Sequence, residues 1–222
     1  MRRLALLLVG GVILALVLAQ VFLPRVAASR ISSRLGRYGK VESVSVKAWP
    51  AVELLWGHAD SATVRAASLA LSTAQTAKLL WEARGVRDID LTVSSARVGR
   101  LHLRDVSFRK RGDQLAARAA MSASDVRASL PEGLEVQLLS SANGEIGVSA
   151  AGGLFGLRAS VDATVAASDG KLVVSPQGLF LEGLRLTLFS QPHVHVQAVG
   201  ASATRESSGG VSYQLTVSAS LG

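Results

Sequence analysis

The first feature of the hydropathy pattern is an apolar run over residues 4–23, in which Gln20 is the only polar side chain. At about 1.5 Å rise per residue, a helix of this length matches a hydrocarbon core of roughly 30 Å. Arg2 and Arg3 precede the run, as in an export signal, and Ala19 ends a small-residue pattern typical of a cleavage site. We therefore expect residues 1–23 to be either a retained transmembrane anchor or a signal peptide removed after Ala19.

Residues 24–40 continue with a helical repeat, because Ala27, Ile31, Leu35 and Tyr38 recur at helical spacing. Arg30, Arg34 and Arg37 line an adjacent basic face, and Arg25 precedes them. We predict an amphipathic juxtamembrane helix whose arginines contact the membrane surface. The alternative is a solvated helix packed on its own domain.

Residues 41–222 are predicted to form one domain in which short strands dominate. Apolar and polar side chains alternate over 41–48, and extended runs recur near 62–71, 89–93, 101–108 and 115–121. Turn signals separate such runs at Gly99, Arg111-Gly112-Asp113, Asp169-Gly170 and Ser208-Gly209-Gly210. The pattern predicts an antiparallel meander.

Three short helices are expected within this domain. Ser72 is a suitable N-cap for an amphipathic helix that runs to Arg84, with Leu79 and Leu80 on its apolar face. Residues 50–56 are predicted to form a short helix closed by Gly57, and Ser124 to cap a single turn over 125–130. Strands with a few helices give an α+β fold class.

The net charge of +8 is typical of a nucleic-acid-binding protein until it is located along the chain. Seven of the basic residues lie within positions 1–40, where there is no acidic residue, and the rest of the chain carries 17 basic and 16 acidic residues. The surplus therefore flanks the apolar run, where anionic headgroups attract it. We expect a membrane partner and no nucleic acid.

Residue types that carry chemistry are sparse. The absence of cysteine excludes disulfides, thiol nucleophiles and zinc-thiolate sites, and the chain has no Gly-x-Ser-x-Gly or His-Glu-x-x-His motif. His193 and His195 share one face of a predicted strand, but no third ligand is apparent. We therefore expect no enzyme activity, no metal and no cofactor.

Two clusters are candidates for binding lipid. Arg109, Lys110 and Arg111 form a basic run beside Phe108, which suits either a phosphate or a solvated hairpin end. Trp49, Leu54, Leu55 and Trp56 form an apolar cluster that either packs in the core or lines the lip of a groove for acyl chains. With Phe108, Leu79 and Leu80, these four are the expected contacts of the lipid chains.

The run from Val44 to Asp60 resembles a stretch of the LmeA-like phospholipid-binding proteins of actinobacteria, where a strand leads into an aromatic-Pro pair, a Leu-Leu and a Gly. Trp49 stands where that family more often has Phe. Further similarity lies in 103–106, 124–131, the Gly-Leu-Phe-Gly loop at 153–156 and 169–172. The resemblance covers nearly all of residues 26–221.

This resemblance implies an exported, membrane-associated protein that binds phospholipid, with some members linked to mannosylated envelope lipids. It also implies a long curved antiparallel sheet wrapped around an amphipathic helix, a roll-like architecture similar to TULIP-type lipid-binding domains. We expect a membrane-anchored, extracytoplasmic protein that holds a lipid in an apolar groove, or one secreted to the envelope if the anchor is cleaved. The alternative is a non-catalytic envelope scaffold that docks a protein partner, whose identity the sequence leaves open.

Overall fold

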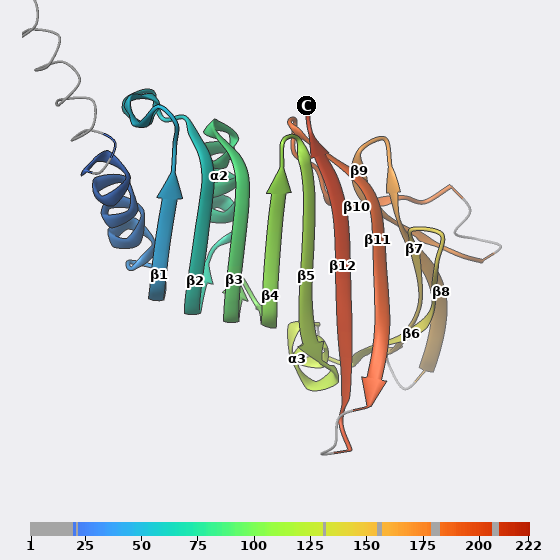
Figure 1. Ribbon diagram of the computed structural model, residues 1–222. Helices are drawn as coiled ribbons and strands as arrows, with labels where there is room; N and C mark the ends of the chain where they lie inside the picture. The colour runs from blue at the N-terminus through green and yellow to red at the C-terminus, as the bar shows by residue number, and fades with distance from the viewer. Residues whose placement is uncertain (1–19, 21, 131, 155–156, 179–182, 206–208) are drawn as a thin grey trace, which may run out of the picture.

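A computed structural model describes residue 20 and residues 22–130, 132–154, 157–178, 183–205 and 209–222. Residues 1–19, which hold most of the predicted anchor and the predicted cleavage site, lie outside the described part. The described chain begins with a helix over 22–35, which runs beside the first strand (Figure 1). No helix within the described residues is both long and apolar enough to cross a membrane.

Seven strands form the larger sheet, in the order β1-β2-β3-β4-β5-β12-β11 (Figure 1). They are β1 (Gly39–Lys47), β2 (Ala59–Leu71), β3 (Val86–Val98), β4 (Leu101–Arg111), β5 (Gln114–Ser122), β11 (Val194–Arg205) and β12 (Val211–Leu221). Hairpin turns at Gly99 and Gly112 connect β3, β4 and β5, and both glycines have positive φ. This confirms the predicted meander over residues 86–122.

The prediction of a wholly antiparallel sheet is wrong for one pair, because β2 and β3 run parallel. Parallel neighbours need a crossover, and α2 (Thr73–Glu82) with the 3-10 turn η2 (Ala83–Gly85) supplies it. The predicted N-cap is confirmed. Ser72 accepts a hydrogen bond from the Gln75 backbone, and the Gln75 side chain accepts one from the Ser72 backbone, which completes a capping box.

A second sheet corrects the expectation of one continuous roll. Its order is β10-β9-β8-β7-β6, with β6 (Leu134–Ala142), β7 (Glu145–Leu154), β8 (Leu157–Ser168), β9 (Lys171–Pro176) and β10 (Leu186–Phe189). Two of its hairpin turns meet the free edge of β11, since Val199 donates to the Gly144 carbonyl at 3.0 Å and Val196 to the Gly170 carbonyl at 2.8 Å. The predicted Asp169-Gly170 turn is confirmed, with both residues at positive φ.

Two short helices complete the chain. The 3-10 helix η1 (Ala51–Trp56) ends at Gly57 in the left-handed conformation, as predicted. The helix α3 (Ala123–Ser129) is capped by Ser122 rather than Ser124, because the Ser122 hydroxyl accepts the Asp125 N–H at 3.1 Å. The helix therefore begins directly at the end of β5.

The core lies under the parallel pair. Ala66, Leu69, Val93 and Ala96 form its buried cluster, and Tyr38 packs against it from the turn that follows the first helix. Leu35, the last residue of that helix, is also buried. The helix over 22–35 therefore packs on its own domain, and the fold is α+β with strands dominant.

Candidate functional site

The larger sheet has one apolar face because side chains alternate along each strand and the register aligns the apolar ones across the strands. We call one line of cross-strand partners the central row and its neighbour the buried row. The central row comprises Val44, Val64, Leu91, Phe108, Ala117, Val217 and Val199. The buried row comprises Val46, Ala62, Ile89, Lys110, Leu115, Ala219 and Val196.

The two rows differ in how well they are covered. Every residue of the buried row is buried, whereas the central row is buried only at Val64 and Val199. The middle of the central row, on β3, β4, β5 and β12, stays partly exposed, and Val217 is 36% exposed. Apolar side chains at the middle of a seven-stranded sheet would normally be covered by a packed layer. The sheet therefore presents an open apolar strip.

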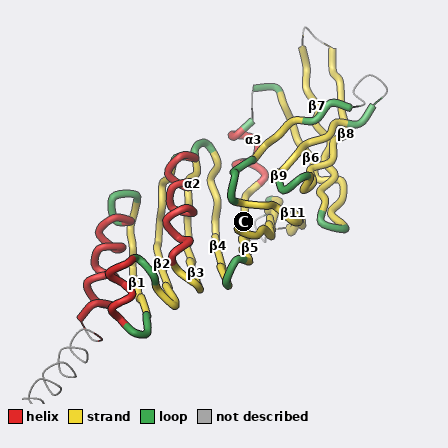
Figure 2. Tube along the Cα trace, turned by 90° about the horizontal axis from the view of Figure 1, so that it is seen from above, coloured by secondary structure: helices red, strands yellow, loops and turns green. Residues whose placement is uncertain are grey.

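The helices over this face cover it loosely. Figure 2 shows α2 over β2 and β3, and α3 with the second sheet farther along. None of the described side chains of α2, which exclude Thr73, is fully buried, and neither is any side chain of α3. Three predicted chain-contact residues, Leu79 and Leu80 of α2 and Phe108 of β4, are half-buried.

The strip leads to a cavity of about 310 Å³ between α3, β6 and the ends of β11 and β12. Val126 of α3, the C-cap residue Leu130, Leu138 of β6 and Tyr213 of β12 line it, and Arg127 adds a cation. Along β12, Tyr213, Leu215 and Val217 follow one another on the same face, and none of them is buried. Tyr213 lines the cavity and lies on this face of β12, so the cavity adjoins the strip. The cavity volume falls within the range of roughly 300–1,000 Å³ typical of ligand sites.

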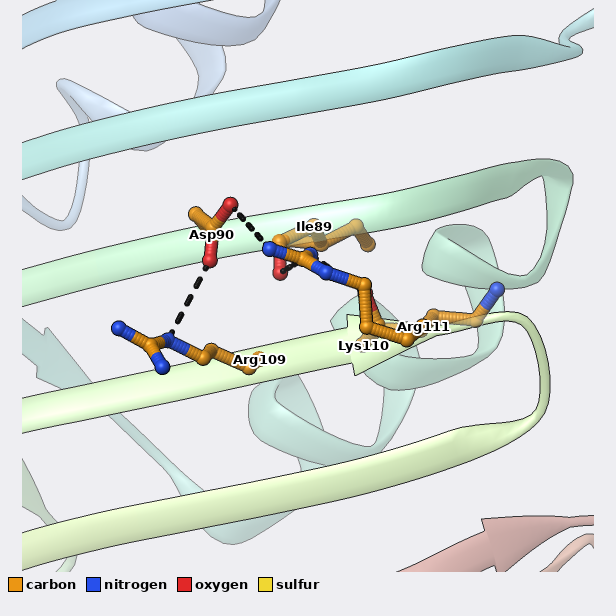
Figure 3. Close-up of polar contacts among 5 residues, drawn as sticks. All are labelled: Ile89, Asp90, Arg109, Lys110 and Arg111. Carbon is orange, nitrogen blue, oxygen red and sulfur yellow. Dashed lines mark hydrogen bonds and ion pairs between the residues drawn. The ribbon is translucent and has the colours of Figure 1, made fainter.

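The predicted basic cluster is divided by the sheet (Figure 3). Arg109 and Arg111 lie on the polar face and pair with Asp90 at 3.5 and 2.7 Å. Lys110 lies in the buried row on the opposite face, where it is 3% exposed and donates to the Val86 carbonyl. The prediction that the three cations form one phosphate site is therefore wrong, because neighbouring residues of a strand point to opposite faces.

The environments of these cations shift their proton affinities in opposite directions. Burial lowers the pKa of Lys110, and the charges of Asp113 and Asp88 oppose that shift. The hydrogen bond to Asp90 raises the pKa of Arg111. Arg109 and Arg111 are therefore held as solvated ion pairs on the polar face, away from the apolar strip.

A comparison with protein families matches residues 14–218 to the LmeA-like phospholipid-binding family. The chain belongs to this family. Neither a search of curated proteins nor a search of solved structures gave a match. Phospholipid binding requires a surface for acyl chains, and the partly exposed strip has the apolar character that this family function needs.

The remaining predicted site residues of this LmeA-like chain lie away from the strip. Trp49 and Trp56 are 76% and 69% exposed beside the ends of β1 and β2, and Leu54 between them is half-buried. The side chain of Leu55 lies outside the described part. The two tryptophans therefore do not pack in the core, and the strand order separates them from Phe108 on β4.

The four arginines predicted to contact the membrane are all exposed, in the helix over 22–35 or, for Arg37, in the turn after it. Arg34 lies 3.6 Å from Glu82 of α2. Both side chains are well solvated, so this ion pair adds little stability. Contact of these arginines with a membrane surface stays a prediction.

The histidines occupy separate places. His195 belongs to β11, and the ring of His193 lies 4.8 Å from that of Trp81. Among the residues that the structure describes, no three His, Asp or Glu side chains are grouped to hold a metal ion.

Sequence reasoning missed the residues that line the cavity. Val126, Leu130 and Tyr213 come from segments distant in sequence, and only the fold brings them together. The sequence did indicate the apolar face of β12, because Tyr213, Leu215, Val217 and Ala219 alternate with polar residues. That alternation identifies an apolar face but not how much of it stays open.

Burial of Lys110 predicts a dependence of stability on pH. Because its pKa is lowered in the folded chain, the unfolded chain binds more protons between the two pKa values, so the free energy of unfolding rises with pH there. We expect the wild type to gain stability relative to Lys110→Met as pH rises towards about 10.4, the usual lysine pKa. Urea unfolding at several pH values measures this difference. The exposed Lys171→Met serves as control, and a wild-type advantage that does not grow with pH contradicts the prediction.

Proposed function

We propose that the chain binds one phospholipid on the apolar face of its larger sheet, without catalysing a reaction. The acyl chains lie along the strip formed by the middle of the central row and by β12, and reach the cavity beside α3. The observation that carries this proposal is the contrast between two adjacent rows of one sheet. One row is buried, and the other is apolar and yet half-open.

The phosphate is proposed to lie near Arg127 at the cavity. Arg127 is exposed and is one of the lining residues, so its guanidinium can meet a phosphate while the lipid chains stay on the apolar face. Arg109 and Arg111 are poorly placed for this role, since they lie on the other face of the sheet and are paired with Asp90. The headgroup therefore belongs at the α3 end of the strip.

The same proposal places the domain on the extracytoplasmic side of the cell membrane, where residues 4–23 hold it. The basic surplus of residues 1–40 supports attachment to an anionic membrane, because it flanks the apolar run on both sides. A lipid-holding domain in this position would support the assembly of envelope lipids or lipoglycans by presenting a phospholipid to other components.

Photo-crosslinking of the full chain tests the proposal. The chain is reconstituted with phosphatidylglycerol that carries a diazirine at the end of one acyl chain, irradiated and mapped by peptide mass spectrometry. We expect crosslinks in peptides of β4, β5 and β12, with the strongest signal around Phe108, Ala117 and Val217.

A lipid that only surrounds the anchor gives a different result. Crosslinks confined to residues 1–23 would show that the sheet holds no lipid and would contradict the proposal. Reconstitution without irradiation serves as the background control.

A further inference from the structure

All three tryptophans of the chain lie exposed at the edge of the larger sheet where β1 ends and where β2 and β3 begin. Trp49, Trp56 and Trp81 are 76%, 69% and 55% exposed. Trp49 follows the end of β1, Trp56 precedes the start of β2, and Trp81 lies in the last turn of α2, which leads into β3. Register places these strand ends together, since Lys47 pairs with Ser61 and Ala59 with Val86. We call these three residues the tryptophan edge.

The backbone that carries the tryptophan edge is held by local contacts. The Trp49 N–H donates to the Asp60 carboxylate at 2.7 Å, and the Gly57 N–H closes η1 on the carbonyls of Glu53 and Leu54. Gly85 lies directly against the Gly57 carbonyl, so the end of η2 touches the end of η1. The Arg84 guanidinium lies 4.4 Å from the Trp81 ring. These contacts therefore fix the backbone that carries the exposed rings.

The apolar N-terminal run meets the domain at this same edge. The side-chain amide of Gln20 donates to the Ala48 carbonyl at 3.0 Å, and its oxygen accepts the Ala51 N–H at 2.8 Å. Ala48 and Ala51 lie on either side of Trp49. Phe22, two residues after Gln20, is 58% exposed. The sequence on the other side of Gln20 is an uninterrupted apolar stretch over residues 4–19.

We propose that the tryptophan edge lies in the interface of a phospholipid bilayer, with the strands of the larger sheet extending away from it. Tryptophan favours the headgroup level because its ring is largely apolar while its N–H can stay hydrated. Leaving three such rings in water at one edge forgoes the stabilisation of burying them. The bilayer is the occupant because the chain itself leads from this edge into a run long enough to span one.

This inference rests on the membrane attachment in the proposed function, but it does not require a lipid on the apolar strip. Crosslinking to β4, β5 and β12 tests the strip, whereas fluorescence of the tryptophans tests the edge. Each result stands if the other fails.

Depth-dependent fluorescence quenching tests the tryptophan edge. Full chains that each retain one tryptophan, with the other two replaced by Phe, are reconstituted into vesicles of equal parts phosphatidylcholine and phosphatidylglycerol. Some vesicles carry a nitroxide near the headgroup and others one near the chain end. We expect the shallow nitroxide to lower the emission of Trp49 and Trp56 about twofold, and the deep nitroxide to have less effect, as interfacial depth requires.

The matched control carries its tryptophan at the opposite edge of the sheet. Ala70→Trp, in a chain with Phe at positions 49, 56 and 81, is exposed near the far end of β2 and away from α3, and at about 3.4 Å per residue it lies roughly 35 Å from the tryptophan edge. Its emission should be unaffected by either nitroxide. Equal quenching at position 70, or no shallow quenching of Trp49 and Trp56, overturns the inference.

Discussion

Replacing Ala117 with Trp is expected to lower the amount of phospholipid held by the folded domain by at least about tenfold, a loss of roughly 1.4 kcal/mol in binding free energy. Ala117 lies in the central row between Phe108 and Val217, where the apolar face is open. An indole at this position would occupy the strip that the acyl chains need. The fold should tolerate it, because Ala117 is only partly buried and is not part of the packed core.

The preceding residue of β5 provides a matched control. Ala116 is exposed and pairs with Arg109 and Ser218 on the polar face, so Ala116→Trp adds the same bulk to the same strand on the opposite side. The measurement is the yield of diazirine crosslinks in β4 and β12 peptides, with equal thermal unfolding of the two variants as the test of folding. Equal crosslinking of Ala117→Trp and Ala116→Trp would show that the lipid does not lie on this strip.

Local patterns predicted the parts of this fold that depend on neighbouring residues. Alternation gave the hairpins between β3, β4 and β5, the Asp-Gly pair gave the β8–β9 turn, and Ser72 gave the start of α2. Each of these features is decided within about ten residues by side-chain period, turn conformation or capping. A single sequence contains that information.

Pairing between distant strands was not predictable in the same way. The local sequence does not show whether two strands joined by a helix, such as β2 and β3, pair with each other in the sheet. It also does not show that β5 pairs with β12, which lies more than eighty residues later. The division into two sheets depends on the same long-range choices. The cavity beside α3 was missed for this reason, since its walls come from α3, β6, β11 and β12.

The separation of the three basic residues onto two faces could have been predicted from the sequence. Residues 109–111 belong to a strand with clear alternation, which places the middle cation on the face opposite to the other two. Treating the three as one site overlooked this geometry. The exposure of Trp49 and Trp56, by contrast, depends on how η1 lies against the strand ends, which alternation does not address.

Replacing Gly39 with Ala is expected to destabilise the chain by about 3 kcal/mol or more, because the added methyl group meets backbone that cannot move aside. A Cβ at Gly39 would overlap the Ser68 carbonyl oxygen, and it would lie 2.7 Å from the carbonyl carbon and 2.9 Å from the Leu69 Cα. Strand pairing fixes these atoms, since Gly39 pairs with Leu69 and the Tyr38 carbonyl accepts the Ala70 N–H at 2.6 Å. Relief requires β1 to separate from β2 at its first residue.

That separation would also loosen the helix over 22–35, which joins β1 through the turn before Gly39. Urea unfolding measures the stability loss, and hydrogen exchange of β1 amides shows whether the damage begins at this strand. Gly147→Ala is the matched control, because its Cβ would crowd the Ser140 hydroxyl at 2.5 Å, a group that can rotate away, while the Ser140 backbone N and Cβ lie at ordinary contact distances of 3.6 and 3.7 Å. It should change stability by less than about 1 kcal/mol. Equal unfolding midpoints for the two variants would mean that the β1–β2 contact is not the fixed junction between the N-terminal helix and the larger sheet.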